Sequence, residues 1–124
     1  MRAEELKGHL DAVLLAALEG GPRHGYAVIE ALRQSTDGRL DLPTGTIYPA
    51  LRRLEQAGLI SGTWSVVGGR RRREYRLTPA GIRALSGRRA AWRDFSATVT
   101  AALESAALVN AALEDTACPS PNPA

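Results

Sequence analysis

Residues 43–60, PTGTIYPALRRLEQAGLI, decide the fold of this 124-residue chain. Ile47, Leu51 and Leu54 recur at the spacing of one helix face, and Gly58 follows as a stop signal. The pattern predicts a short amphipathic helix. Its outward face would carry Gly45, Tyr48, Pro49, Arg52 and Gln56, with Arg53 on the flank.

This outward face suits insertion into a DNA groove, because small residues allow close approach and the arginines would anchor phosphates. An ordinary amphipathic helix with a solvated basic side would show the same pattern. The neighbouring segments are therefore needed to distinguish the two interpretations. Proline is best tolerated in the first turn of a helix, so Pro49 is predicted near the start. The N-cap would then lie within Thr44–Thr46, and Thr46 is the better chemical choice.

Two further helices are predicted before this segment. The first covers Leu6–Glu19 and ends at Gly20-Gly21-Pro22. The second covers Gly25–Ser35 and is followed by a turn at Thr36-Asp37-Gly38. Leu40–Leu42 alternates apolar and polar residues, which indicates a very short extended segment.

A basic hairpin is predicted after the helix. Leu59–Val67 and Arg70–Leu77 alternate like strands, and Gly68-Gly69 is a two-residue turn signal between them. The apolar residues that share a strand face are Ile60, Trp64 and Val66, then Tyr75 and Leu77. The four arginines Arg70–Arg73 lie beside the turn, where they could reach phosphates or the minor groove. A solvated loop or a nonspecific basic patch is the alternative.

A long helix is predicted from Pro79 to Leu113, with Thr78 as its N-cap. A break at Gly87 stays open. Apolar residues follow a coiled-coil-like spacing, namely Leu85, Trp92, Val99, Ala106 and Leu113 every seventh residue, with Phe95, Ala102 and Val109 between them. The pattern predicts a dimer surface.

Together these elements predict a mainly α fold with a small β-hairpin: a winged helix-turn-helix plus a long C-terminal dimerisation helix. The expected organisation is a DNA-binding domain over residues 1–78, the dimerisation helix over 79–114 and a disordered tail over 115–124.

The composition limits the function. The net charge of +3 suits a polyanionic partner, and a chain with 5% aromatic residues has a modest core that dimerisation would extend. The single Cys118 is too little for a disulfide framework or a metal site, which fits the cytoplasm. We expect no signal peptide, membrane span, metal, cofactor or catalytic constellation.

The chain resembles the PadR family of bacterial transcriptional regulators. The residues that carry the resemblance are Pro22-Arg23-His24-Gly25-Tyr26, Gly45-Thr46-Ile47-Tyr48-Pro49-Ala50-Leu51-Arg52-Arg53-Leu54-Glu55, Gly58-Leu59-Ile60 and Gly69–Gly81. The resemblance implies a homodimeric repressor that places this helix in the major groove of a roughly palindromic operator in double-stranded DNA. It also implies that Tyr48 approaches the DNA backbone, and that the C-terminal helix packs on the partner subunit.

Trp92 and Phe95 have two interpretations. We interpret both first as packing residues of the dimer seam, because aromatic residues at helical spacing usually pack. Some short members of the PadR family, which the chain resembles, have a tryptophan on the last helix that lines a pocket at the dimer centre. Trp92 would match it, and with Phe95 it could bind a planar apolar effector that releases the protein from DNA.

The sequence thus favours a DNA-binding regulator. A winged-helix protein–protein interaction module is the alternative, and a MarR-like regulator would require more helices. The predicted DNA contacts are Thr44, Gly45, Thr46, Tyr48, Pro49, Arg52, Arg53, Arg70, Arg71, Arg72 and Arg73. The predicted dimerisation residues are Leu10, Leu14, Leu85, Trp92, Phe95, Val99, Leu103, Val109 and Leu113.

Overall fold

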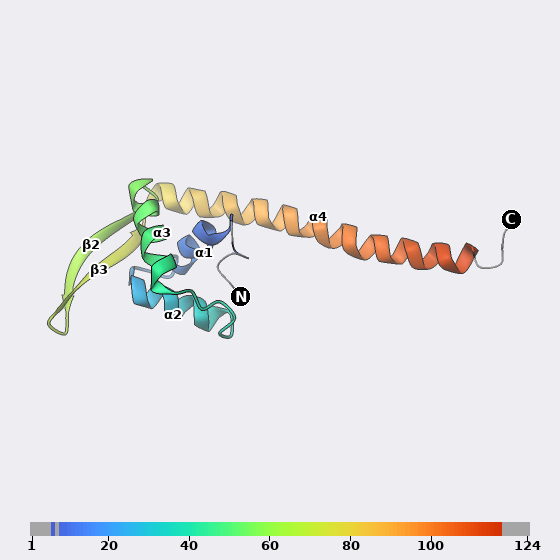
Figure 1. Cartoon of the computed structure of the whole chain (residues 1–124). Coiled ribbons are helices and arrows are strands. Elements are labelled where there is room, and N and C mark those ends of the chain that lie inside the picture. Colours follow the sequence, from blue (N-terminus) through green and yellow to red (C-terminus); the bar gives the residue numbers. More distant parts are fainter. Residues whose placement is uncertain (1–5, 7, 118–124) are drawn as a thin grey trace. The chain divides into compact units, whose positions relative to one another are not determined.

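A computed structural model describes residue 6 and residues 8–117 of the chain. The chain divides into two units, residues 1–88 and 89–124, and each is described here by itself. The described residues form α1 (Leu10–Ala17), β1 (Arg23–His24), α2 (Gly25–Ser35), α3 (Thr44–Gln56), β2 (Ile60–Val67), β3 (Arg70–Leu77) and α4 (Pro79–Ala117) (Figure 1). This mostly helical arrangement with a small antiparallel sheet confirms the winged-helix fold.

The core of the first unit holds α3 by its inner face. Ile47, Leu51 and Leu54 are each at most 1% exposed, as the helical spacing predicted. They share one hydrophobic cluster with Leu14 and Leu15 of α1. Burying a side chain of this size stabilises the fold by about 1.5–3 kcal/mol. The inner face therefore fixes α3 in place while its opposite face remains at the surface.

α1 is shorter than predicted. It begins at Leu10 rather than Leu6, and it ends at Ala17 rather than Glu19. Gly8 has φ of 88°, a left-handed conformation that is incompatible with a continuous helix. The N–H of His9 bonds to the carbonyl of Leu6 at 2.7 Å, so the chain before Gly8 makes a separate turn. Leu6 is still buried in the core.

α2 has the predicted bounds. Thr36 organises the chain behind it, because its hydroxyl donates to the Leu32 carbonyl at 2.7 Å and accepts from the Leu40 N–H at 3.0 Å. The segment Leu40–Leu42, predicted as a very short extended segment, pairs with no strand in the described structure. Leu40 and Leu42 are buried, which explains their alternation with an exposed Asp41.

α3 begins earlier than predicted. Its N-cap is Pro43 and not Thr46, and the N–H groups of Thr46 and Ile47 both bond to the Pro43 carbonyl, at 3.0 and 3.1 Å. Pro49 therefore lies inside the helix. It cannot donate to the carbonyl of Gly45, but both residues are exposed, so water can replace the missing hydrogen bond.

The sheet has the order β1-β3-β2, and both pairings are antiparallel. β3 matches its prediction, and β2 begins one residue later than predicted. β1 was not predicted; in it, Arg23 pairs with Tyr75 and His24 pairs with Glu74. Two residues are too few for a strand pattern to be visible in the sequence.

The hairpin of β2 and β3, here called the wing, extends away from α1, α2 and α3 (Figure 1). Gly68 and Gly69 have φ of 59° and 78°, which a two-residue type I′ turn requires. The predicted apolar face exists, but only its base is buried. Ile60 is 1% exposed, whereas Trp64 and Val66 are 58% and 70% exposed.

α4 begins as predicted. The hydroxyl of Thr78 accepts from the Gly81 N–H at 3.0 Å and donates to the Gly58 carbonyl at 2.7 Å. The backbone stays helical at Gly87 and continues to Ala117, three residues into the segment 115–124 that was predicted as a disordered tail. Cys118 and the rest of that tail lie outside the described residues.

The sequence was expected to contain no stretch long enough to span a membrane, and α4 exceeds that length. Residues Pro79–Leu113 include an 18-residue window with a mean hydropathy of 1.2, so length and composition alone would let this helix cross a membrane. The alanines of its second half raise the hydropathy without forming a continuous run of large apolar residues. Core helices of soluble proteins meet the same criterion.

Candidate nucleic-acid interface

The outer face of α3 is exposed as the sequence predicted. Thr44, Gly45, Pro49 and Arg52 are exposed, and the ring of Tyr48 is 41% exposed. Thr46 is half-buried. Because the first two turns carry small or uncharged side chains, the backbone of α3 can come close to another molecule there. Arg52 follows one turn later, and it is positioned to donate hydrogen bonds to an anion.

The start of α2 fixes the ring of Tyr48. A β-carbon on Gly25 would lie 2.4 Å from Cε1 of Tyr48 and 2.9 Å from its hydroxyl oxygen. Only glycine at position 25 leaves room for the ring in this place. The two motifs His24-Gly25-Tyr26 and Ile47-Tyr48-Pro49 therefore meet at one contact.

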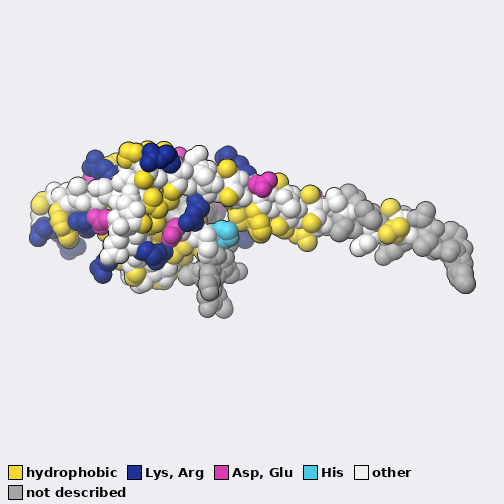
Figure 2. Space-filling view, turned by 90° about the horizontal axis from the view of Figure 1, so that it is seen from above, with side chains coloured by type: hydrophobic (Ala, Val, Ile, Leu, Met, Phe, Trp, Pro, Cys, Tyr) yellow, Lys and Arg dark blue, Asp and Glu magenta, His cyan; other side chains and the backbone are white. Residues whose placement is uncertain are grey.

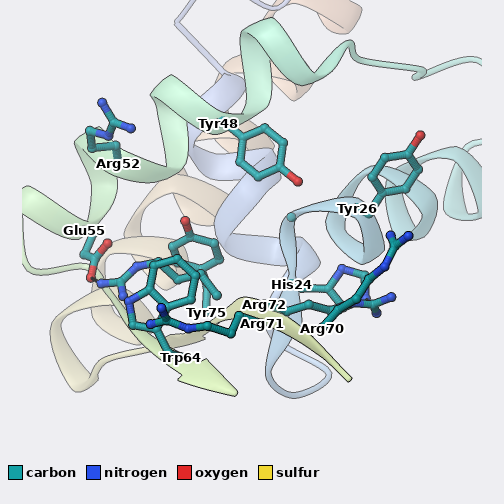
Figure 3. Close-up of a pocket in the computed structure, with 12 residues that line it drawn as sticks. His24, Tyr26, Tyr48, Arg52, Glu55, Trp64, Arg70, Arg71, Arg72 and Tyr75 are labelled. Carbon is teal, nitrogen blue, oxygen red and sulfur yellow. Dashed lines mark hydrogen bonds and ion pairs between the residues drawn. The ribbon is translucent and has the colours of Figure 1, made fainter. Parts of the chain in front are cut away.

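A cleft of about 690 Å³ lies between α2, α3 and the wing. Figure 3 shows Tyr48 and Arg52 projecting from α3, and Trp64 and Arg71 from the wing, around this cleft. The residues that line it are His24, Gly25, Tyr26, Tyr48, Arg52, Glu55, Trp64, Arg70, Arg71, Arg72, Arg73 and Tyr75. Aromatic rings and guanidinium groups thus share one surface, and they can provide both stacking and anion binding.

Arg73 is tied to α3. Its guanidinium donates to Oε2 of Glu55, and the same oxygen accepts the N–H of Gly62 at 3.2 Å. This hydrogen bond to Glu55 is the main reason that the pKa of Arg73 is raised, and partial burial opposes it. Arg73 therefore stays charged, but a carboxylate already neutralises it.

The other wing arginines differ in their contacts. The guanidinium of Arg71 lies 4.6 Å from the ring centroid of Trp64, and that of Arg73 lies 5.4 Å from it. Arg72 contacts Nε2 of His24 at 3.0 Å. Arg70 and Arg71 are exposed, whereas Arg72 and Arg73 are half-buried.

Arg53 contacts α1 within its own unit. Its guanidinium forms an ion pair with Asp11 at 2.7 Å. The side chains of Arg53 and Asp11 are 58% and 27% exposed. Such a partly exposed pair contributes little to stability, and it could exchange for another anion.

Among the residues that the structure describes, no group of three or more His, Cys, Asp and Glu side chains could hold a metal ion.

A sequence profile of the Transcriptional regulator PadR-like family matches residues 14–87, which include the second half of α1, the sheet, α2, α3 and the start of α4. The chain belongs to the PadR-like family. PadR-like proteins are transcriptional regulators, so this chain is a DNA-binding regulator and not an enzyme.

The individual relatives are consistent with this family assignment. The chain is 42% identical over 77 residues to Transcriptional regulator Rv3488 of Mycobacterium tuberculosis, a match that covers 62% of this chain and 59% of that protein. The fold is similar to a PadR family transcriptional regulator from Eggerthella lenta, with a TM-score of 0.70, 33% identity and coverage of 82% and 87% of the two chains. It is also similar to a transcriptional regulator from Clostridium thermocellum, with a TM-score of 0.73, 28% identity and coverage of 79% and 96%.

Several residues of this PadR-like surface were missing from the sequence prediction. Gly25, Glu55 and Trp64 each contact a residue that was predicted to bind DNA. The quoted motifs contain Gly25 and Glu55, but they do not show that these residues contact Tyr48 and Arg73, which are 23 and 18 positions away. Trp64 was predicted on an apolar strand face, and the local sequence does not show that Arg73 lies opposite it on β3.

The predicted dimerisation residues separate into two groups. Leu14 and Leu85 are 0% and 3% exposed and belong to the core of the first unit, so their side chains are not available to a partner. Leu10 is half-buried against the same core. The heptad pattern could not separate these core positions from surface positions, because both repeat at helical spacing.

The second unit carries the exposed positions of the set. The exposed large apolar residues there are Trp92, Phe95, Val99, Leu103 and Leu113. Figure 2 shows hydrophobic side chains gathered along this helix. The rings of Trp92 and Phe95 are 6.0 Å apart and inclined at 37°. The side chain of Val109 lies outside the described residues.

Proposed function

We propose that this regulator is a repressor that binds a roughly palindromic operator as a homodimer. One observation supports this most directly: the outer face of α3 and the arginines of the wing line the same cleft. In this proposal α3 enters the major groove and the wing contacts the flanking backbone. Binding operator DNA would exclude other proteins from the same site.

The predicted DNA contacts take different roles in this proposal. The tip of α3, with Thr44, Gly45 and Thr46, approaches the bases, and Tyr48 and Pro49 lie against the backbone. Arg52, Arg70 and Arg71 are exposed and contact phosphates. The arginines that already have protein partners, namely Arg53, Arg72 and Arg73, contact DNA only after exchanging or sharing those partners.

The dimer would form through α4. Trp92, Phe95, Val99 and Leu103 follow one another by three, four and four positions, which places them along one stripe of a helix. Their exposed apolar area is unfavourable in water, and a second copy would cover it at a gain of roughly 25 cal/mol per Å². Leu113 and Val109 would extend the stripe.

An apolar effector is the last part of the proposal. The paired rings of Trp92 and Phe95 offer a surface on which a planar apolar molecule could stack. Titration of tryptophan fluorescence with flat cationic dyes tests this, in the wild type and in Trp92→Ala. Unchanged emission together with unchanged DNA affinity would remove the effector from the proposal.

We place this function in the cytoplasm, where bacterial DNA is found. A protein–protein interaction module is less well supported. It would favour an acidic or apolar outer face on α3, whereas that face carries Arg52 and the neighbouring wing carries five arginines.

Selection of bound fragments from random duplex DNA, at a stated salt concentration, tests the proposal. The expected product is two inverted half-sites with centres about one helical turn apart, or a multiple of it. A reporter fused to a promoter that contains the selected site should lose expression when the chain is produced. Absence of any enriched sequence would contradict specific binding, and increased expression would contradict repression.

A further inference from the structure

We infer that Glu55 positions the wing against α3, so that both elements fit one DNA duplex. Glu55 itself would not contact DNA. The inference rests on the proposed DNA-binding function, and it adds a residue whose role is to hold another residue in place.

The first support is the pattern of contacts at Glu55. One carboxylate oxygen, Oε2, binds both strands of the wing: it accepts from the backbone of Gly62 on β2 and from the side chain of Arg73 on β3. β2 is an edge strand, so alternate N–H groups point away from β3 and need another acceptor. Glu55 satisfies one of them, and it thereby connects α3 to the wing at two points.

The second support is the space around Arg73. A β-carbon at position 62 would lie 2.7 Å from Nε of Arg73, so Gly62 leaves the room through which Arg73 reaches α3. The ring of Trp64 contacts the same guanidinium at 5.4 Å. Arg73 is thus confined by Glu55, Gly62 and Trp64. The side chains of Arg73 and Glu55 are 31% and 27% exposed, which limits screening of their pair by solvent.

The charges have a measurable consequence. Glu55 neutralises Arg73, so Arg73 should contribute little to counterion release, in contrast to the exposed Arg70 and Arg71. If Glu55 becomes neutral, Arg73 is released, and the wing loses its fixed position. Sequence discrimination should then fall while the dependence of binding on salt becomes steeper.

The experiment compares Glu55→Gln with Glu74→Gln. Glu74→Gln is a matched control because it removes the same negative charge from the position next to Arg73 on β3. Each full-length variant is titrated with the duplex that the wild type selects and with a scrambled duplex of equal length, at several salt concentrations. We expect Glu55→Gln to lower the affinity ratio of selected to scrambled duplex by roughly tenfold. The slope of log affinity against log salt should steepen by up to about 0.9 in Glu55→Gln. Glu74→Gln should keep the wild-type affinity ratio of selected to scrambled duplex.

Two further variants separate positioning from folding. Arg73→Gln should lose the same discrimination without a steeper salt slope, because no charge is released. The reversed pair Glu55→Arg with Arg73→Glu should recover part of the lost discrimination. In a Trp92→Phe background, Trp64 is the remaining tryptophan. Its quenching by iodide should change in Glu55→Gln, since Arg73 leaves its ring.

Wild-type discrimination and slope in Glu55→Gln would overturn the positioning role. Equal effects of Glu55→Gln and Glu74→Gln would also overturn it, because Glu55 would then act only as a negative charge near DNA. Failure of the wild type to discriminate any selected duplex is a different result, which contradicts the proposed function itself.

Discussion

The ring of Tyr48 occupies the space that a side chain at position 25 would need. A β-carbon on Gly25 would come within 2.4 Å of Cε1 of that ring, so the first residue of α2 determines where an aromatic residue of α3 can lie. Tyr48 is proposed to contact the DNA backbone. The influence of residue 25 on the position of this ring can therefore be tested by measuring DNA affinity.

Gly25→Ala should weaken DNA binding because the ring of Tyr48 has to rotate away from its present position. The ring belongs to a flexible side chain, so we expect the protein to stay folded. The loss of affinity should match that of Tyr48→Ala within about threefold, and the double variant should add little to it. Fluorescence anisotropy with the selected duplex measures this. Additive losses would show that Gly25 and Tyr48 act separately.

Gly81→Ala should destabilise the fold strongly. A β-carbon there would lie 1.9 Å from the carbonyl oxygen of Leu59, which is a backbone atom and cannot rotate away. We expect a loss of about 3 kcal/mol or more in the free energy of unfolding. Gly87→Ala is the matched control in the same helix, because nothing lies within 4 Å of its added carbon. It should stabilise by about 0.5–1 kcal/mol, and urea denaturation compares the two.

The exposed wing arginines should control the salt dependence of binding. Arg71→Ala should weaken binding to every duplex and flatten the slope of log affinity against log salt by about 0.9. Arg70→Ala should do the same. Arg53→Ala should change the slope less, because Asp11 already neutralises Arg53. An equal change in all three slopes would mean that the intramolecular ion pair does not persist in the complex.

Tyr75 predicts a loss of stability at high pH. Burial of its hydroxyl raises its pKa above the usual value of about 10, and this is the largest cause of the shift. The unfolded chain releases the proton first, so the contribution of Tyr75 to stability is complete below about pH 10 and is lost as the pH rises through the folded pKa. Tyr75→Phe should remove this part of the pH dependence. Melting temperatures measured between about pH 9 and 11 test it, and an unchanged slope in Tyr75→Phe would contradict it.

The sequence predicted the elements whose signals are local. α2 and β3 have the predicted bounds because glycine or turn residues flank a clear period on each side. The predicted start of α3 was wrong because proline usually lies in the first turn of a helix. Here Pro49 lies further inside, since the exposed Gly45 carbonyl can bond to water instead. Element type was therefore easier to predict than the chemistry at an element end.

The candidate site was predicted as a set of residues, but its internal contacts were not. The outer face of α3 and the wing arginines follow from periodicity and charge. The pairs Glu55–Arg73 and Asp11–Arg53 join positions that are 18 and 42 residues apart, and no local pattern connects them. These contacts change which arginines are available to an anion, so the number of arginines in the sequence overstates the charge that DNA would encounter.

The strand that the sequence did not reveal has a consequence for local unfolding. β1 pairs with β3 only at Glu74 and Tyr75, so β3 has a hydrogen-bonded neighbour on both sides there, whereas β2 has one neighbour. Opening of the hairpin should start at Gly68-Gly69 and stop before these two residues. In amide hydrogen exchange, the tip should exchange early, and the amides around Glu74 and Tyr75 should be protected until the whole domain unfolds.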